Sequence, residues 1–145
     1  MIINTKYFGE IEIDESKKIT FPKGLPAFEE IKEYVLIDLP DNPVFHCLQS
    51  TKQSEVAFLV IQPWDFFHDY DIDIPQGDLD ELGINKKEQV LIYNIVTIPK
   101  DFKKMTANLL GPIVINIENL KGKQVILTQE DYQTKHPLVE IKEEV

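Results

Sequence analysis

The sequence predicts a mainly β fold: a single-domain antiparallel β-barrel-like or sandwich structure with one to three short helical turns. Short runs rich in Val, Ile, Phe and Tyr follow one another, and segments rich in Pro, Gly, Asn and Asp separate them. Little helical periodicity lies between these runs, which favours an antiparallel sheet over a parallel α/β sheet. The length of 145 residues fits one domain over 1–145, and a frayed tail is expected at 138–145.

Each predicted strand is a short β-rich run that ends at a turn-forming segment. GEIEI and KITF lie close together near the start, and YVLIDL, VFHCLQ and EVAFLVIQP follow. QVLIYNIVTI, GPIVINI and KGKQVILT supply the later strands. Segments such as LPDNP, LGINKK and DIPQGD favour turns between them. The predicted strands are 9–13, 18–21, 34–39, 44–49, 55–63, 89–98, 111–117 and 121–128.

Helical signals are confined to a few positions. Asp78 is an N-cap acid with a glutamate three residues later, and Gly83 follows as a C-terminal stop. The segments 26–34 and 128–133 each permit one further turn. The aromatic residues after Pro63 indicate a turn, or one helical turn, that directs these side chains into the core.

The charge of the chain restricts its partners. Fifteen lysines oppose twenty-five acids, which gives a net charge of −10, and there is no arginine. Arginine is the usual residue for bidentate recognition of phosphate and guanine, so this composition disfavours nucleic acid and anionic membranes. The start of the chain lacks the basic and apolar blocks of a secretory signal, and no run is long enough for a membrane helix. We therefore expect a cytoplasmic protein without direct nucleic-acid or membrane contacts.

The stretch WDFFHDYDIDI, residues 64–74, combines aromatic residues, carboxylates and a histidine. Asp69, Asp71 and Asp73 match the first ligands of a calcium loop, but the position that requires Gly is Ile74, and flanking helices are absent. The alternation in YDIDI instead predicts an edge strand with its aspartates facing water.

No motif for catalysis or cofactor binding occurs in the sequence. His46, His68 and His136 are far apart and lack metal-ligand spacing. Cys47 lies among apolar residues and is predicted to be a buried structural thiol, with His46 on the opposite face of the strand. There is no GxSxG, GxGxxG or P-loop. We predict no catalytic, metal or cofactor-binding residues; the alternative is a small β-barrel enzyme whose catalytic residues meet only in the fold.

Four blocks in order resemble the FliW family of flagellar assembly factors. ITFPKGLPAFEEIKEYVLI, residues 19–37, resembles the family's first block, and residues 45–74 resemble the block that ends in PxxFxxDY. MTANLLGPIVIN, residues 105–116, and GKQVIL with KHPL resemble the later blocks. Ala27 and Gly111 stand where the family often has Gly and Ala.

The resemblance implies a non-enzymatic assembly factor with a mainly antiparallel, β-barrel-like fold. Proteins of this family bind flagellin. When flagellin has been exported, the freed factor binds the translational repressor CsrA and relieves repression of flagellin mRNA, with an allosteric component favoured. The expected partners are therefore flagellin and CsrA, no cofactor is expected, and the free protein is expected to be monomeric.

The acids are concentrated between residues 65 and 81, where there are seven and no lysine. This region is either a solvated acidic face or a docking surface for a basic protein. Because CsrA must hold RNA, its binding surface is expected to be positive, and an acidic face is complementary to it. The predicted CsrA-binding residues are Asp65, Asp69, Asp71, Asp73, Asp78, Asp80 and Glu81.

The flagellin contact is expected to be more apolar, because the terminal segments of flagellin are helical and amphipathic before assembly. A groove that accepts such a helix uses exposed apolar residues. For each candidate, a role in the core or in a turn is the favoured alternative, and Asn108 serves equally well to cap a turn. The candidates are Phe21, Leu25, Pro26, Phe28, Asn108, Leu109 and Pro112.

Overall fold

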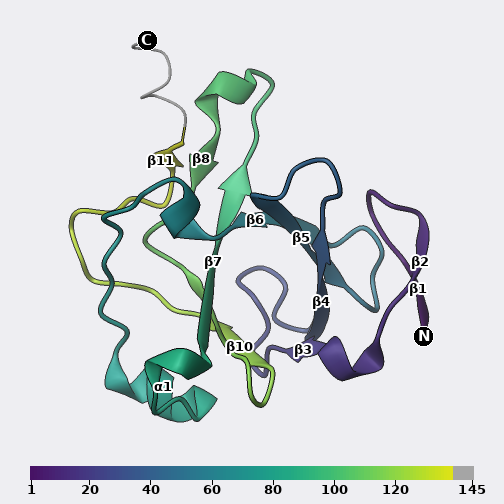
Figure 1. Ribbon diagram of the computed structural model, residues 1–145, viewed down its shortest axis with the longest axis horizontal. Helices are drawn as coiled ribbons and strands as arrows, with labels where there is room; N and C mark the ends of the chain where they lie inside the picture. The colour runs from purple at the N-terminus through teal and green to yellow at the C-terminus, as the bar shows by residue number, and fades with distance from the viewer. Residues whose placement is uncertain (139–145) are drawn as a thin grey trace.

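A closed barrel of seven strands forms the body of the computed structural model, which describes residues 1–138 (Figure 1). In order around the barrel the strands are β7 (Val90–Thr97), β6 (Ala57–Ile61), β5 (Phe45–Ser50), β4 (Glu33–Asp38), β3 (Ile19–Thr20), β10 (Lys121–Gln124) and β9 (Ile113–Asn116). β7 closes the barrel because it pairs with both β6 and β9. All neighbours are antiparallel except β3 and β10, which run parallel. The predicted barrel class is confirmed.

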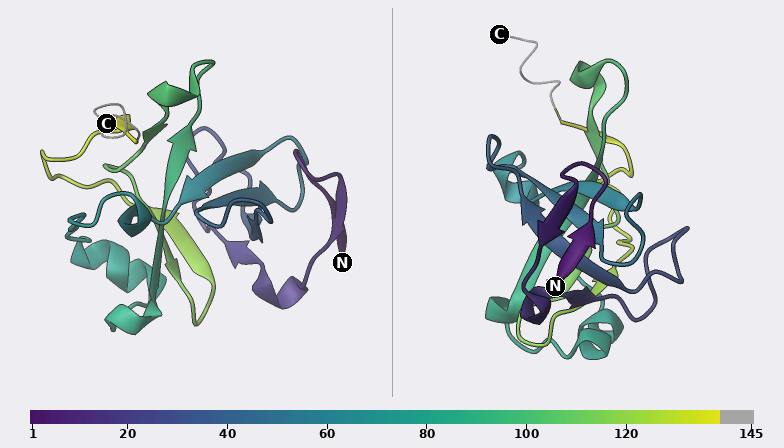
Figure 2. Two further views of the ribbon diagram at one scale, coloured as in Figure 1. Left: turned by 45° about the horizontal axis from the view of Figure 1, so that its top comes forward. Right: turned by 90° about the vertical axis from the view of Figure 1, so that its right-hand side faces the viewer.

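Short elements extend this barrel at two ends. β1 (Ile2–Asn4) and β2 (Glu10–Glu12) form a separate antiparallel hairpin, which lies on the opposite side of the molecule from α1 (Gln76–Leu82) (Figures 1 and 2). β8 (Thr106–Ala107) pairs with the end of β7 and with β11 (His136–Pro137). The 3-10 helices are η1 (Glu15–Lys17), η2 (Pro63–Asp65), η3 (Lys87–Gln89) and η4 (Phe102–Lys104). No helix within residues 1–138 has the length and apolarity needed to cross a membrane.

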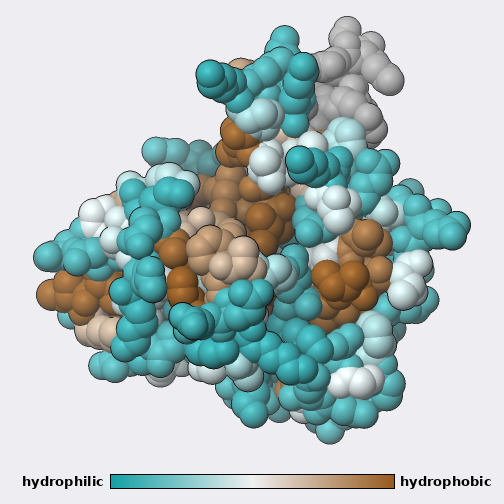
Figure 3. Space-filling view, turned by 180° about the vertical axis from the view of Figure 1, so that it is seen from behind, coloured by the Kyte–Doolittle hydropathy of each residue, from teal (hydrophilic) through white to brown (hydrophobic). Residues whose placement is uncertain are grey.

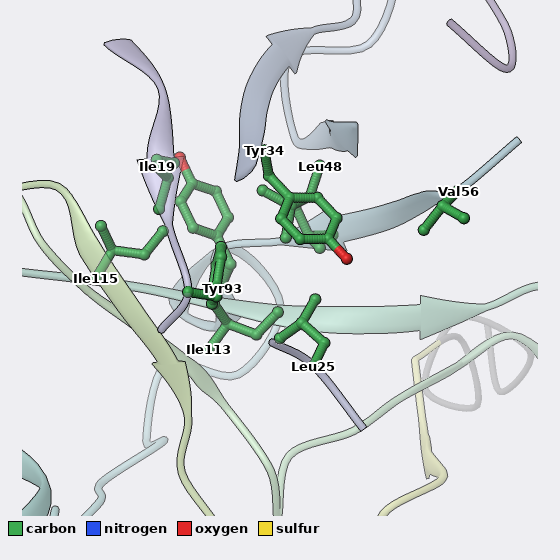
Figure 4. Packing of buried hydrophobic residues seen from close by; sticks show 10 residues of the cluster. Ile19, Leu25, Tyr34, Leu48, Val56, Tyr93, Ile113 and Ile115 are labelled. Carbon is green, nitrogen blue, oxygen red and sulfur yellow. The ribbon is translucent and has the colours of Figure 1, made fainter. Parts of the chain in front are cut away.

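Apolar side chains from several strands point toward one another inside the barrel (Figure 4). The rings of Phe21 and Tyr34 pack edge to face with centroids 5.3 Å apart. Burial raises the pKa of Tyr34 to about 12, so its phenol stays neutral. The buried members of this interior cluster are Ile19, Phe21, Leu25, Tyr34, Leu48, Val56, Val60, Tyr93, Ile113 and Ile115.

A second apolar cluster covers the outer face of β7 and β9, where Ile92 and Val114 lie opposite each other. α1 packs over this face, and two asparagine side chains fix its end. The amides of Asn116 and Asn119 donate to the carbonyl of Leu82 at 2.9 and 3.0 Å. These bonds satisfy a carbonyl that the helix leaves unpaired at its C-terminus.

Most of the predicted elements are present. Each predicted strand overlaps an observed strand, and Gly83 ends α1 in the left-handed conformation, with φ of 72°. β1, β8 and β11 were not predicted, because pieces of two or three residues carry little periodic signal. The expected N-cap role of Asp78 is wrong, because α1 begins two residues earlier and Pro75 occupies the cap.

Two of the expected helical turns are absent. In 26–34 the chain makes successive tight turns, because Gly24 and Ala27 adopt positive φ values that a right-handed helix cannot accommodate. In 128–133 the backbone carries no helix, and the carbonyl of Gln133 instead accepts from the amide of Leu109 at 3.0 Å. The expected edge strand within 70–74 is also wrong, since no strand within residues 1–138 pairs with this segment.

The C-terminal tail was expected to fray from residue 138. Leu138 is buried, and its amide donates to the carbonyl of Met105 at 3.0 Å. Residues 139–145 lie outside the described part of the chain.

Replacement of Ala27 by glycine is expected to stabilise the protein. Ala27 has φ of 72°, a left-handed conformation that costs an L-residue about 1–2 kcal/mol and costs glycine almost nothing. Part of this gain is offset by the greater entropy of glycine in the unfolded chain, about 0.4–1 kcal/mol. We expect Ala27→Gly to raise the free energy of unfolding by about 0.5–1 kcal/mol in urea titrations. The matched control, Ala57→Gly in β6, should lower it by a similar amount; a loss in both variants would contradict the strain at Ala27.

Candidate binding groove

The candidate site begins at the PxxFxxDY element, residues 63–70, which holds Pro63 and Tyr70 inside the protein. Pro63 is buried at the first position of η2, and Tyr70 is 4% exposed. The phenol of Tyr70 donates to the carbonyl of Leu109 at 2.7 Å, and the indole of Trp64 donates to the carbonyl of Tyr70 at 2.8 Å. Burial raises the pKa of Tyr70 to about 12. Asp69 is exposed and Tyr70 is buried, as predicted for this element, but the expected inward position of Trp64 is wrong, because its side chain is 41% exposed.

Side chains, rather than a neighbouring strand, hold the extended segment 71–74. The phenol of Tyr132 accepts from the amide of Asp71 at 2.8 Å and lies 3.0 Å from its carbonyl. The side chain of Gln129 donates to the carbonyl of Asp71 at 2.8 Å and accepts from the amide of Asp73 at 3.0 Å. These bonds imitate one edge of a β-ladder. The aspartates are exposed and the isoleucines half-buried, which confirms the predicted alternation.

A groove of about 860 Å³ lies between this segment, α1 and the start of β7. Its apolar lining packs on the outer cluster of the barrel, and carboxylates stand in the same lining. This size and mixture are typical of a site that binds a ligand or a peptide. The apolar lining includes Ile72, Ile74, Leu79, Ile84, Val90 and Ile92, and the acidic lining is Asp71, Asp73 and Asp80.

The seven acids between residues 65 and 81 divide into three groups. Lys123 forms ion pairs with Asp78 and, at 3.1 Å, with Glu81, and Lys23 pairs with Glu81 at 2.9 Å. The ammonium groups of Lys23 and Lys123 hold the pKa of Glu81 below its usual value. These two acids attach α1 to the barrel and are already neutralised. The three groove acids are exposed, and Asp65 and Asp69 are exposed outside the groove.

Most of the predicted flagellin-binding residues lie inside the protein. Phe21, Leu25 and Leu109 are at most 1% exposed, and Pro112 is buried, because they fill the barrel and the space beneath β8. The carbonyl oxygen of the Asn108 side chain accepts from the amide of Gly111 at 2.8 Å, which is the turn-capping role. In this conformation only Pro26, Phe28 and Asn108 of the predicted set reach the surface.

The exposed apolar surface comes mainly from other residues. The surface seen from behind is largely hydrophilic, with apolar areas between the hydrophilic ones (Figure 3). The exposure of these side chains could not be predicted from the sequence, because the closure of the barrel decides which faces of the strands and loops are covered. The large apolar residues exposed by more than a third are Met1, Ile2, Tyr7, Trp64, Ile98, Phe102, Ile117 and Ile126.

Cys47 and His46 are neighbouring residues of β5. Cys47 is 1% exposed, and burial raises the pKa of its thiol to about 11, which confirms the predicted buried thiol. His46 bonds the carboxylate of Asp38 at 2.9 Å and packs against the ring of Tyr93. Among residues 1–138, no three His, Cys, Asp or Glu side chains gather as metal ligands would.

Three residues that anchor the groove could not be identified from the sequence. Tyr132 and Gln129 hold segment 71–74, and Lys123 holds α1 from a strand 45 residues away from its partner Asp78. None of these residues lies in a recognisable motif. Their partners are distant in the sequence, so only the folded chain brings them together.

A closed seven-stranded barrel with an acid-lined groove defines a small β-barrel protein with a surface suited to binding. The profile of the family described as "FliW protein" matches residues 2–138. The chain therefore belongs to the FliW family of flagellar assembly factors.

Relatives and a solved structure agree with this assignment. The flagellar assembly factor FliW of Alkaliphilus metalliredigens is 43% identical over 141 residues, 97% of this chain and 87% of the relative. That of Bacillus subtilis is 40% identical over 138 residues, 95% of this chain and 96% of the relative. A crystal structure of the flagellar assembly factor FliW matches with a TM-score of 0.89 at 42% identity, covering 95% of this chain and 96% of that one. The resemblance seen in the sequence blocks is confirmed.

Proposed function

We propose that this protein is a cytoplasmic, non-enzymatic partner switch in flagellar assembly. It binds flagellin, and when it is free it binds the translational repressor CsrA, so that repression of flagellin mRNA is relieved. Membership of the FliW family over residues 2–138 carries this proposal. The two partners compete, and the free protein is a monomer.

The charge distribution supports the proposed CsrA contact. Five carboxylates between residues 65 and 81 are exposed and are not engaged by lysine within the described chain. With a net charge of −10 and no arginine, the protein is repelled by RNA and attracted to a basic RNA-binding protein. Asp78 and Glu81 serve this contact indirectly, because their pairs with lysine hold α1 in place.

The proposed flagellin contact uses the exposed part of the predicted set. Pro26 is exposed, and Phe28 is half-buried with its ring packed against Phe58 at a centroid distance of 5.5 Å. Phe21 and Leu25 lie beneath these residues in the barrel cluster, where they support the loop rather than touch a partner. An amphipathic helix is the form of flagellin segment that this apolar surface suits.

Charge reversal at Asp69 and Asp71 is expected to weaken CsrA binding. Both carboxylates are exposed, and lysine at these positions repels a basic surface instead of attracting it. We expect the Kd of the D69K/D71K variant for CsrA to rise about tenfold at low salt, roughly 1.4 kcal/mol, and its dependence on salt to flatten. Calorimetric titration at several salt concentrations measures both effects.

The matched control for this reversal is E10K/E12K in β2. These glutamates are exposed, have the same i, i+2 spacing and make the same change of charge, but lie on the hairpin opposite α1 (Figure 1). The control should retain most of the affinity. Unchanged binding of D69K/D71K at low salt would overturn the acidic contact.

Competition between the partners tests the function itself. The protein should co-purify with flagellin and, separately, with CsrA, and added flagellin should displace CsrA in a dose-dependent manner. Failure to bind either partner would overturn the proposed function, whereas a stable ternary complex would overturn the competition.

A further inference from the structure

One edge of β7 has no partner strand where it borders the groove. β6 pairs with β7 at Asn94 and Ile95, and then the chain turns away at Pro63 into η2. Residues 90–92 therefore pair with β9 but not with β6, and they line the groove. No other strand within residues 1–138 pairs with this edge of β7 in place of β6.

The alternation of hydrogen bonds along β7 determines which backbone groups face this open side. The carbonyls of Gln89 and Ile95 accept hydrogen bonds from the β9 and β8 side at 2.8 and 2.9 Å. Because backbone groups alternate in direction along a strand, those of Val90 and Ile92 point to the opposite side. The amide of Val90 donates to the carbonyl of Lys87. Within the described chain, the carbonyl of Val90 and both backbone groups of Ile92 have no hydrogen-bond partner.

The segment on the other wall of the groove is also paired along one edge only. The amide and carbonyl of Asp71 and the amide of Asp73 bond to the side chains of Tyr132 and Gln129. In an extended chain the backbone groups of Ile72 and Ile74 point to the opposite side. These groups have no hydrogen-bond partner among residues 1–138. Two half-paired backbone edges thus border one groove with an apolar floor.

We propose that an extended segment of a basic partner protein adds to the free edge of β7 in this groove as a further strand. The hydrogen-bonding groups of Ile92 supply the main-chain contacts of strand addition, and alternate side chains of the segment enter the apolar lining. A helix is a poorer occupant, because it satisfies its own backbone and leaves Ile92 unpaired. The rim acids select a lysine or an arginine in the segment; they are Asp71, Asp73 and Asp80.

This inference rests on the proposed function for the identity of the partner, which is CsrA as the basic protein of the two. The groove also contains Lys86 and Lys87, from the loop before β7, so its lining is not uniformly acidic. Charges of both signs in one lining favour one direction of the added strand over the other, because the basic residue of the segment must lie near the carboxylates and away from the lysines.

Amide hydrogen exchange of the full chain, resolved by residue with and without saturating CsrA, tests strand addition without a substitution. The amide of Ile92 is expected to exchange at least about tenfold more slowly in the complex, because it gains a partner. The amide of Leu91 serves as the internal control, since residues 91 and 115 are already opposite each other in the β7–β9 ladder. Its exchange should change much less.

A variant pair tests the acidic rim. D71K/D73K should raise the Kd for CsrA about tenfold and reduce the protection of Ile92 at a fixed CsrA concentration. The control E10K/E12K carries the same charge and spacing on β2 and should leave both values within about twofold of the wild type. Unchanged affinity of D71K/D73K would overturn the role of the rim.

The outcomes separate the inference from the proposed function. Binding of CsrA without protection of Ile92 would overturn strand addition and leave the partner switch intact. Protection of the Ile92 amide by flagellin but not by CsrA would contradict the assignment of CsrA as the partner that supplies the added strand. Absence of CsrA binding would overturn the proposed function and this inference with it.

Discussion

Phe21→Ala is expected to lower the free energy of unfolding by about 3–5 kcal/mol. The Phe21 side chain is fully buried, and its ring packs edge to face on Tyr34 with centroids 5.3 Å apart. It also lies against Gly122 of β10, where an added Cβ would stand 2.6 Å from the ring. Truncation leaves a cavity at the junction of the parallel pair β3 and β10, whose ladder consists of the single pair Thr20 and Lys121.

Urea unfolding of the Phe21→Ala variant measures this loss. The matched control is Phe102→Ala, because Phe102 is 64% exposed and its truncation should change stability by no more than about 0.5 kcal/mol. Equal effects in the two variants would contradict the interior position of Phe21.

Gly24→Ala is the second large expected loss, and two effects combine in it. Gly24 has φ of 64°, which costs an L-residue about 1–2 kcal/mol. A Cβ there would also lie 2.5 Å from the Cα and the carbonyl oxygen of Glu29. Both contacts are with backbone, which cannot rotate away, so overpacking adds about 1–3 kcal/mol. The expected total is a loss of about 2–5 kcal/mol.

Gly9→Ala isolates the conformational part of this loss, so its difference from Gly24→Ala gives the steric part. Gly9 has the same φ of 64°, but no atom lies within 4 Å of its added Cβ. Its variant should therefore lose only the conformational cost of about 1–2 kcal/mol. Thermal or urea unfolding of both variants measures the difference. If Gly24→Ala is no more destabilised than Gly9→Ala, the close approach of Glu29 does not limit this turn.

The strands could be predicted from the sequence because their signal is local. Side chains alternate between the two faces of a strand, so runs such as QVLIYNIVTI carry their own evidence. Gly83 was predicted as a helix stop for the same kind of reason, since a left-handed residue is needed at that single position. A helical turn was expected within 26–34 because the composition of this segment also suits a helix, and an alanine at 27 does not by itself indicate a positive φ.

The candidate site depended more on distant contacts. The sequence identified the acidic stretch and the outward direction of Asp71 and Asp73, and it identified the family through blocks of matching residues. It did not show that Lys123 neutralises Asp78, because these residues are 45 positions apart. It also did not show that two candidate contact residues are covered, Phe21 inside the closed barrel and Leu109 in the cluster beneath β8.

The sequence by itself determined the family of this protein, its β fold, its excess of acidic residues and its lack of arginine. Periodicity, turn chemistry and charge are properties of neighbouring residues, so they can be read without the fold. The tertiary structure alone decided that β6 leaves β7 at Pro63 and that a groove with a free strand edge results. The physical reason is that the pairing of a strand edge depends on the positions of segments distant in the sequence, so no local sequence pattern predicts this pairing.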